Sequence, residues 1–556
     1  MVPLRAYASI LNITTNRETR SSVMKNKYIY LIWFIALLPT MILRDYTPKN
    51  ELRYLSIVDE ALRNGNIFTF TNQGEIYADK PPLHFWMMMV GKLILGEHRM
   101  WYYSLLSFIP ALIILIVMSK WTRREIGANK TTPQLILITT GLFTGATLIV
   151  RMDMLMNMFI VLSLYTFYQM YKGENSKLNS FLFPVFVFLA LFSKGALGFL
   201  IPFVSTSLFL LYKKRLSRFK MYWGWKSLLI ILTACIIWFS GVYFEGGSEY
   251  LKNLLVHQTV ERGIDSFHHK EPLYYYTISV WYSLAPWSLL AIGFIIVGLY
   301  KKLINTVLEQ YFAIIIISTF ILLSLISSKI EIYSLPMIPF FIYVSVMLFK
   351  KFDMQNRWVK LSIVFPAIIL ILAFPTIVYL SSIEEIQYLT NPFIYAGAGV
   401  FTITGLLVIY ILYKRRRTYR AITSLALGFL LAIFTVGWSM PQLNNQIGWK
   451  NLCEKAMGLS EEQHIANFWV YDISRAENMD VYFKKDIIKV HREEIVNQPL
   501  ENRILLLKSK VIKTDPEIYA IIHGHEQYQI GRYTIVLSNG KDYVKPDLDI
   551  PLHKKM

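Results

Sequence analysis

The chain is built from one apolar run after another, and this feature most constrains how it can fold. Of its 556 residues, 54% are hydrophobic. The runs are roughly 17–25 residues long, enough for each to cross a bilayer as a helix. We count about thirteen such runs between residues 28 and 439. The pattern therefore predicts a polytopic α-helical integral membrane protein rather than a soluble globule.

Six short basic clusters punctuate the runs at alternate gaps and predict the orientation. Together they hold 22 Lys or Arg against three acids. Short loops rich in Lys and Arg stay cytoplasmic, so the remaining gaps open on the outer face. An odd number of spans then places the carboxyl-terminal tail outside as well. The clusters are Lys120–Lys130, Lys172–Lys177, Lys213–Lys220, Lys301–Lys302, Lys350–Lys360 and Lys414–Arg420.

Charge, cysteine content and glycine patterns exclude several classes of function. The formal net charge is +20, but most of the excess lies in the six clusters, so anchoring at an anionic inner leaflet explains it better than nucleic acid does. The two cysteines, Cys235 and Cys453, are too few for a disulfide framework or a cysteine-based metal site. No Walker or dinucleotide glycine pattern appears, so we expect no nucleotide cofactor.

Three regions follow from composition. Residues 1–27 are polar and predict a cytoplasmic tail or a wrongly assigned start of translation. Residues 28–444 form the predicted transmembrane domain, with long outer loops at 44–100 and 245–276. Residues 445–556 are charged and contain short β-like runs at 504–507 and 533–537, which predict a small periplasmic α/β domain.

Ionisable residues beside apolar runs are costly, so they are paired or functional. Two groups lie in the first outer loop. The segment Asn50-Glu51-Leu52-Arg53-Tyr54 follows the first span. Its polar residues suit a functional site, but a helix start with Asn50 as its cap is the simpler explanation. In Asp79-Lys80-Pro81-Pro82 the prolines hold the backbone extended before a helix, so Lys80 could bind a lipid phosphate or act as an interfacial anchor.

Two further groups lie at later outward gaps. Asp153 follows Arg151 between two spans, where a salt bridge is the simpler explanation. Arg262 and His268-His269-Lys270 suit a polyanionic ligand or a metal, although a histidine pair is weak evidence for zinc. A carboxylate that deprotonates an acceptor and cations that bind phosphate are what glycosyl transfer from a polyprenyl phosphate needs.

The order of these motifs resembles the polyprenyl-phosphate-dependent glycosyltransferases, a family that includes the lipid A aminoarabinose transferases and, more distantly, the protein O-mannosyltransferases. Residues 50–54 lie where that family has an acidic pair followed by Arg-Tyr, and residues 79–82 resemble its Glu-Lys-Pro motif. The further matches are Asp153, Ser193-Lys194-Gly195, the His-basic-x-Pro-aromatic-Tyr-Tyr stretch at 269–275, Pro286-Trp287, and Ser328-Lys329 with Tyr333.

The resemblance implies a GT-C type fold and sugar transfer from undecaprenyl phosphate to lipid A or another envelope glycolipid at the periplasmic face of the bacterial inner membrane. It implies catalytic carboxylates at Glu51 and Asp153, and a divalent metal ion shared by Asp79 and His269. The substrate-binding residues that it implies are Arg53, Lys80, Arg262, Lys270, Lys329 and Tyr333.

Two departures from the family pattern bear on these roles. Asn50 replaces the first acid of the pair, and an amide cannot act as a base, so the base is either Glu51 or Asp153. Asp79 replaces a glutamate and is one methylene shorter, which weakens the metal assignment.

Other functions remain open from sequence. A protein O-glycosyltransferase would use the same donor type with a protein acceptor. A transporter or flippase for lipid-linked sugars would explain the many spans, although transporters tend to show repeated halves and none is evident here. A structural membrane scaffold would leave the motif set unexplained.

Overall fold

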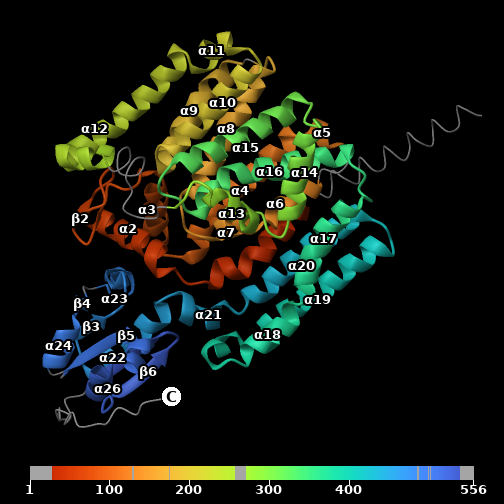
Figure 1. Cartoon of the computed structure of the whole chain (residues 1–556). Helices are drawn as coiled ribbons and strands as arrows, with labels where there is room; N and C mark the ends of the chain where they lie inside the picture. Colours follow the sequence, from red (N-terminus) through yellow and green to blue (C-terminus); the bar gives the residue numbers. More distant parts are fainter. Residues whose placement is uncertain are drawn as a thin grey trace, which may run out of the picture. The chain divides into compact units, whose positions relative to one another are not determined.

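The computed structural model describes residues 28–127, 131–174, 176–256, 271–484, 487–498, 500 and 502–538, and Figure 1 shows the order of their elements along the chain. Contacts within the chain divide it into two compact units. The helical unit is built from residues 28–42, 65–71 and 76–439, and the mixed unit from 43–64, 72–75 and 440–538. The mixed unit thus contains a segment from the predicted first outer loop.

The helical unit consists of long apolar helices. Eight helical segments of the described residues are long and apolar enough to cross a membrane, or up to ten when each bent helix pair counts as one span. The predicted multi-pass helical class is confirmed, whereas the count of thirteen remains a prediction. The eight are α4 (Met100–Trp121), α9 (Lys177–Lys194), α12 (Trp225–Val256), α15 (Val307–Leu325), η5–α16–η6 (Glu331–Lys351), α17–α18 (Arg357–Ser381), α19 (Pro392–Tyr413) and α20 (Thr418–Gly437).

Shorter helices complete this unit. A first helix spans Tyr28–Leu43. The others are α3 (Leu83–Leu95), α5 (Arg123–Ile126), α6 (Thr131–Ile138), α7 (Gly141–Leu148), α8 (Asp153–Tyr171), α10 (Leu197–Tyr212), η3 (Leu216–Arg218), α11 (Phe219–Trp223), α13 (Tyr275–Ser283), α14 (Ser288–Tyr300) and η7 (Glu384–Leu389).

Three predicted spans differ from the helices observed. The ascent predicted at 226–244 continues as helix to Val256, across a non-helical Gly247 with φ of 73°, a conformation that glycine tolerates. The descent predicted at 277–299 is divided into α13 and α14 around Pro286, which has no backbone N–H to continue a helix. The rise predicted at 133–150 is divided between α6 and α7.

Helices α8 and α9 form an antiparallel hairpin that positions the candidate site. They pack closely along their lengths, and α8 also contacts α4 and α10. Helix α8 has 19 residues, so it is about 28 Å long, close to the ~30 Å hydrocarbon core of a bilayer. Asp153 and Lys194 lie at one end of the hairpin, and the basic cluster Lys172–Lys177 lies at the other.

The mixed unit is built around a five-stranded sheet of order β4-β3-β5-β7-β6. Strand β3 pairs in parallel with β4 and β5, whereas β7 pairs antiparallel with β5 and β6. The predicted β-like runs are confirmed by β5 and β7. The strands are β3 (Asn467–Tyr471), β4 (Ile488–Lys489), β5 (Arg503–Lys508), β6 (Glu526–Ile530) and β7 (Tyr533–Ser538).

The middle strands are buried on both faces by the unit's helices, with Ile504, Leu505, Leu506 and Leu507 of β5 all buried. A two-stranded hairpin, β1 (Thr71–Asn72) and β2 (Glu75–Ile76), stands apart from this sheet. The helices are η1 (Pro48–Leu52), α2 (Arg53–Asn64), α21 (Met440–Ile447), α22 (Lys450–Gln463), η8 (Ala476–Met479), α23 (Asp480–Phe483), α24 (Arg492–Asn497), α25 (Ser509–Thr514) and α26 (Pro516–Ile522).

The amino-terminal segment joins the mixed unit through Asp45. One oxygen of its carboxylate accepts hydrogen bonds from the Tyr46 N–H and the Tyr482 hydroxyl, both at 2.7 Å. The other accepts the Lys450 N–H at 2.9 Å, at the start of α22. The Asp45 N–H donates to the Asn444 side chain at 2.9 Å. This single side chain therefore connects η1, α22 and α23.

Candidate active site

The helical unit buries a charged cluster at the first turn of α8. Asp153 is 1% exposed, and its carboxylate pairs with the Lys194 ammonium and with the Arg151 guanidinium, the latter at 3.0 Å. The sequence predicted a salt bridge between Arg151 and Asp153, and the structure confirms it. An acid at a helix N-terminus also gains from the positive end of the helix dipole. The carboxylate is therefore held ionised in an apolar surrounding.

Lys194 is the last residue of α9, where a cation is favoured by the negative end of the helix dipole. The helix ends there because Gly195 follows with φ of 110°, in the range that favours glycine. Its ammonium also lies 4.2 Å from the centre of the Tyr333 ring, a cation–π contact. Lys194 thus connects the carboxylate of Asp153 to Tyr333, one of the predicted substrate-binding residues.

Lys329 and Tyr333 flank the turn that opens η5 (Glu331–Met337). Lys329 is 3% exposed, and its ammonium donates a 2.8 Å hydrogen bond to the Glu271 carbonyl. The Tyr276 hydroxyl donates to the Ile330 carbonyl at 3.2 Å, which holds the turn against α13. Two predicted phosphate-binding residues therefore belong to one short, anchored segment.

His84 completes the surroundings of Asp153 and was not singled out from sequence. It lies in the first turn of α3, is fully buried, and is within electrostatic range of the Asp153 carboxylate. A histidine two residues after Pro81-Pro82, at the start of an apolar run, was the available signal. Lys194 belongs to the Ser193-Lys194-Gly195 motif, and the sequence signal for a role is that it is the one charged residue between Lys177 and Lys213.

Asp79 and Lys80, both half-buried, precede α3. The backbone before them is fixed by Tyr250 of α12, whose hydroxyl donates to the Tyr77 carbonyl and accepts the Phe70 N–H, each at 2.9 Å. Asp79 lies within electrostatic range of this tyrosine. The Asp79-Lys80 motif is therefore attached to α12 on one side and leads into the helix that carries His84 on the other.

Glu51 and Arg53 belong to the mixed unit. Glu51 is 1% exposed and accepts two hydrogen bonds from the Arg44 guanidinium, both at 2.7 Å. It also accepts the Thr47 N–H at 2.7 Å and the Thr47 hydroxyl at 2.9 Å. These four bonds match the acceptor capacity of a carboxylate. The geometry is that of a structural anchor for η1, and the catalytic role of Glu51 remains a prediction.

Arg53 is half-buried, with its guanidinium 3.5 Å from the Asn50 side-chain oxygen and 5.8 Å from the Tyr54 ring centre. The predicted residues Arg262, His269 and Lys270 lie outside the described residues. Within the described part of the chain, no three His, Cys, Asp or Glu side chains are grouped as metal ligands. Because one of its two members is not described, the Asp79–His269 metal pair remains a prediction.

The buried cluster combines an ionised carboxylate with cations in a low-dielectric setting, where charge–charge interactions are strong. Such a site can hold a phosphate through lysines and orient a hydroxyl through a carboxylate. The fold is that of a polytopic α-helical membrane protein, and the cluster offers the carboxylate and cations that glycosyl transfer from a polyprenyl phosphate needs.

Comparison with known proteins agrees with this class. Residues 79–239 match the family model described as dolichyl-phosphate-mannose-protein mannosyltransferase, and this range holds Asp79, Lys80, Asp153 and Lys194. The fold matches the crystal structure of ArnT from Cupriavidus metallidurans bound to undecaprenyl phosphate, with a TM-score of 0.71 at 16% identity, over 93% of this chain and 98% of the other.

Two curated relatives are similar in sequence. The undecaprenyl phosphate-alpha-4-amino-4-deoxy-L-arabinose arabinosyl transferase 1 of Pseudomonas fluorescens is 22% identical over 76% of this chain and 75% of its own length. An uncharacterised protein of Aquifex aeolicus is 26% identical over 55% of this chain, and the match spans 62% of the relative's own length.

Proposed function

We propose that this protein transfers a sugar from undecaprenyl phosphate to lipid A or another envelope glycolipid. The observation that carries the proposal is the buried Asp153–Lys194 pair with Tyr333 on the other side of Lys194. Buried charges of this kind are expensive and mark functional sites in membrane proteins. The name of the Pseudomonas fluorescens relative and the lipid bound to the Cupriavidus metallidurans protein support the choice of donor.

The proposed reaction needs a carboxylate and cations around one sugar. The acceptor hydroxyl gives its proton to a carboxylate, and its oxygen forms a bond to the anomeric carbon. The bond from that carbon to the carrier phosphate oxygen breaks, and undecaprenyl phosphate leaves with the negative charge. Lys329 and Lys80 would offset this charge, with Arg262 and Lys270 in the same role.

We assign the carboxylate role to Asp153 rather than Glu51. Three of the four hydrogen bonds that Glu51 accepts go to Oε2 and the fourth to Oε1, so this carboxylate is committed to Arg44 and Thr47. Asp153 is paired with two cationic side chains, Arg151 and Lys194, and we propose that Lys194 shifts from it toward an arriving phosphate. Arg53 and Tyr333 remain proposed contacts of the substrate.

We propose that the site faces the periplasm from the bacterial inner membrane. The α8–α9 hairpin supports this orientation, because it places Asp153 and Lys194 at the end opposite the basic cluster Lys172–Lys177. A divalent ion held by Asp79 and His269 would add positive charge beside the donor phosphate. No nucleotide or nucleic acid is part of the proposal.

Mass spectrometry of lipid A from cells with and without the gene tests the function. Expression of the wild-type chain is expected to add one sugar mass to lipid A, and expression of Asp153→Asn is expected to add none. A lipid A profile that is the same with and without the gene would exclude lipid A as the acceptor.

A protein acceptor is the second candidate, favoured by the description of the family model that residues 79–239 match. It predicts a glycoprotein that disappears on deletion of the gene while the lipid A profile stays constant. A flippase for lipid-linked sugars remains a third alternative, and it predicts no covalent transfer by the purified protein.

A further inference from the structure

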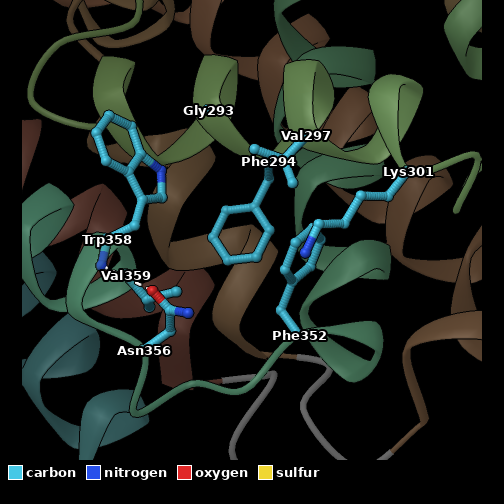
Figure 2. Close-up of a pocket in the computed structure, with 8 residues that line it drawn as sticks. All are labelled: Gly293, Phe294, Val297, Lys301, Phe352, Asn356, Trp358 and Val359. Carbon is cyan, nitrogen blue, oxygen red and sulfur yellow. Dashed lines mark hydrogen bonds between the residues drawn. The ribbon is translucent and has the colours of Figure 1, made fainter.

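A cavity of about 110 Å³ lies between α14 and the start of α17 (Figure 2). It belongs entirely to the helical unit and is formed where two of the basic clusters, Lys301–Lys302 and Lys350–Lys360, come together. Its lining residues are Gly293, Phe294, Val297, Lys301, Phe352, Asn356, Trp358 and Val359.

The walls of the cavity are apolar, and its hydrogen-bond donors lie at the rim. Phe294 and Phe352 form the inner wall, with ring centres 4.8 Å apart in an edge-on contact. Figure 2 shows the Lys301 side chain pointing back toward these rings and the Trp358 indole standing across the cavity. The Asn356 side-chain oxygen accepts the Trp358 backbone N–H at 2.9 Å, so its amide nitrogen retains its donors.

Lys301 differs from Lys350 and Lys351, which both have polar partners. Lys351 pairs with Glu309 at 2.7 Å, and Lys350 donates to the Glu125 carbonyl at 2.6 Å. Within the described part of the chain, the Lys301 ammonium has no ion-pair or hydrogen-bond partner. The two clusters hold six Lys or Arg against Asp353 alone, so the rim attracts an anion.

The size of the cavity limits its occupant. A site that encloses a drug-sized ligand measures ~300–1,000 Å³, so this cavity takes only a small group such as a phosphate with part of a glycerol. Beside it, α14 and α17 expose apolar side chains that can hold an acyl chain. Ile296 is 58% exposed, and Leu361 and Phe365 are each 53% exposed.

We infer that this cavity binds the phosphate headgroup of an anionic membrane phospholipid, with Lys301, Asn356 and Trp358 around the phosphate and the acyl chains on α14 and α17. Basic pockets between membrane helices are suited to such headgroups. This lipid site goes beyond the transfer reaction and lies among the basic clusters, whereas Asp153 and Lys194 lie at the cluster-free end of their hairpin.

Native mass spectrometry of the purified full-length protein tests this inference, with phosphatidylglycerol and phosphatidylcholine as probes. Phosphatidylglycerol is expected to bind and phosphatidylcholine to bind at least fivefold more weakly. Lys301→Gln is expected to weaken the binding of phosphatidylglycerol about fivefold, which corresponds to ~1 kcal/mol for one lysine at a membrane surface. Val297→Trp fills the cavity without removing charge, and it is expected to weaken the binding of phosphatidylglycerol at least as much.

Lys302→Gln is the matched control, because it removes the same charge one residue outside the lining. It is expected to leave phosphatidylglycerol binding within twofold of the wild type. Equal binding by wild type and Lys301→Gln, or an equal loss in Lys302→Gln, would overturn the inference. The inference would also be overturned if the protein bound inorganic phosphate as tightly as phosphatidylglycerol. None of these readouts depends on sugar transfer, so the two proposals fail separately.

Discussion

Lys194 at the end of α9 and Asp153 at the start of α8 form a buried ion pair between residues that lie 41 positions apart. Each charge lies at the helix end whose dipole favours it. The pair closes the hairpin at one end, and the Lys194 ammonium also lies 4.2 Å from the centre of the Tyr333 ring. Catalysis and stability are therefore expected to depend on the same two side chains.

Asp153→Asn is expected to lower kcat/KM for sugar transfer by about 10²–10³-fold, the range for loss of one well-placed electrostatic group. It also leaves Lys194 buried opposite a neutral amide, which is expected to cost about 3–5 kcal/mol of unfolding free energy. Transfer to lipid A and thermal unfolding of the purified protein measure the two effects.

The double variant Asp153→Asn, Lys194→Met separates the effect on transfer activity from the effect on stability. Removing both charges is expected to recover most of the lost stability but none of the transfer activity. A stable double variant that transfers sugar at the wild-type rate would rule out a catalytic role for the pair.

Lys329→Ala is expected to raise KM for the polyprenyl-phosphate donor by about tenfold or more, since a hydrogen bond to a charged group contributes ~1.5–3 kcal/mol. Lys329→Arg retains the charge and is expected to recover part of the affinity. Initial rates at varied donor concentration provide the measurement. An unchanged KM in Lys329→Ala would exclude this lysine from the phosphate site.

Glu51→Ala is expected to act mainly on stability. It leaves the Arg44 guanidinium, whose side chain is 9% exposed, without its bidentate partner, at a cost of about 3–5 kcal/mol. Thermal unfolding of Glu51→Ala and Arg44→Met, each alone and combined, gives the coupling between them. If Glu51→Gln unfolds like the wild type yet transfers no sugar, Glu51 is the base instead of Asp153.

The mixed unit is expected to lose stability as the pH rises from about 4 to about 6. Burial raises the pKa of Asp480 to about 6 from an ordinary 3.8, against the opposing hydrogen bond from the Ser56 hydroxyl at 2.8 Å. The folded state holds this proton more tightly than the unfolded state does. Stability from this group is therefore present below pH 4 and lost as the pH passes 6, by at most ~3 kcal/mol for two pKa units.

Asp480→Asn mimics the protonated side chain and is expected to flatten this dependence. Thermal unfolding of the two proteins between pH 4 and 7 is the comparison, with the variant more stable only at the upper end. An equal slope in both proteins would assign the pH dependence to other groups.

Removal of divalent metal with EDTA is expected to lower transfer activity, and Mg²⁺ or Mn²⁺ is expected to restore it, if Asp79 and His269 share an ion. Asp79→Ala and His269→Ala are expected to abolish this response, whereas His268→Ala leaves it intact. Full activity in EDTA would remove the metal from the mechanism.

The class of fold could be predicted from the sequence because helices that span a membrane need apolar runs of bilayer length, and the basic residues between these runs mark the cytoplasmic loops. The sheet of the tail was also predictable in part, since β5 and β7 are the longest buried strands and appear as continuous apolar runs. Asp153, Lys329 and Tyr333 stand in recognisable short motifs, so their residue types could be singled out.

The partners of those residues could not be predicted in the same way. The contact of Lys194 with Asp153 depends on how α8 packs against α9, and no local pattern encodes which helix ends meet. His84 approaches Asp153 only because α3 begins directly after Pro81-Pro82. The anchoring of Glu51 depends on Arg44, seven residues earlier, and no sequence motif pairs the two.

The carboxylate of Asp45 has a consequence for the order of events during biosynthesis. Its partners Lys450 and Tyr482, and Asn444, which accepts the Asp45 N–H, are made some 400 residues later. At ~5–20 residues per second, the ribosome needs roughly 20–80 s to reach them. Throughout that interval Asp45 lacks the later residues to which it hydrogen-bonds in the folded protein.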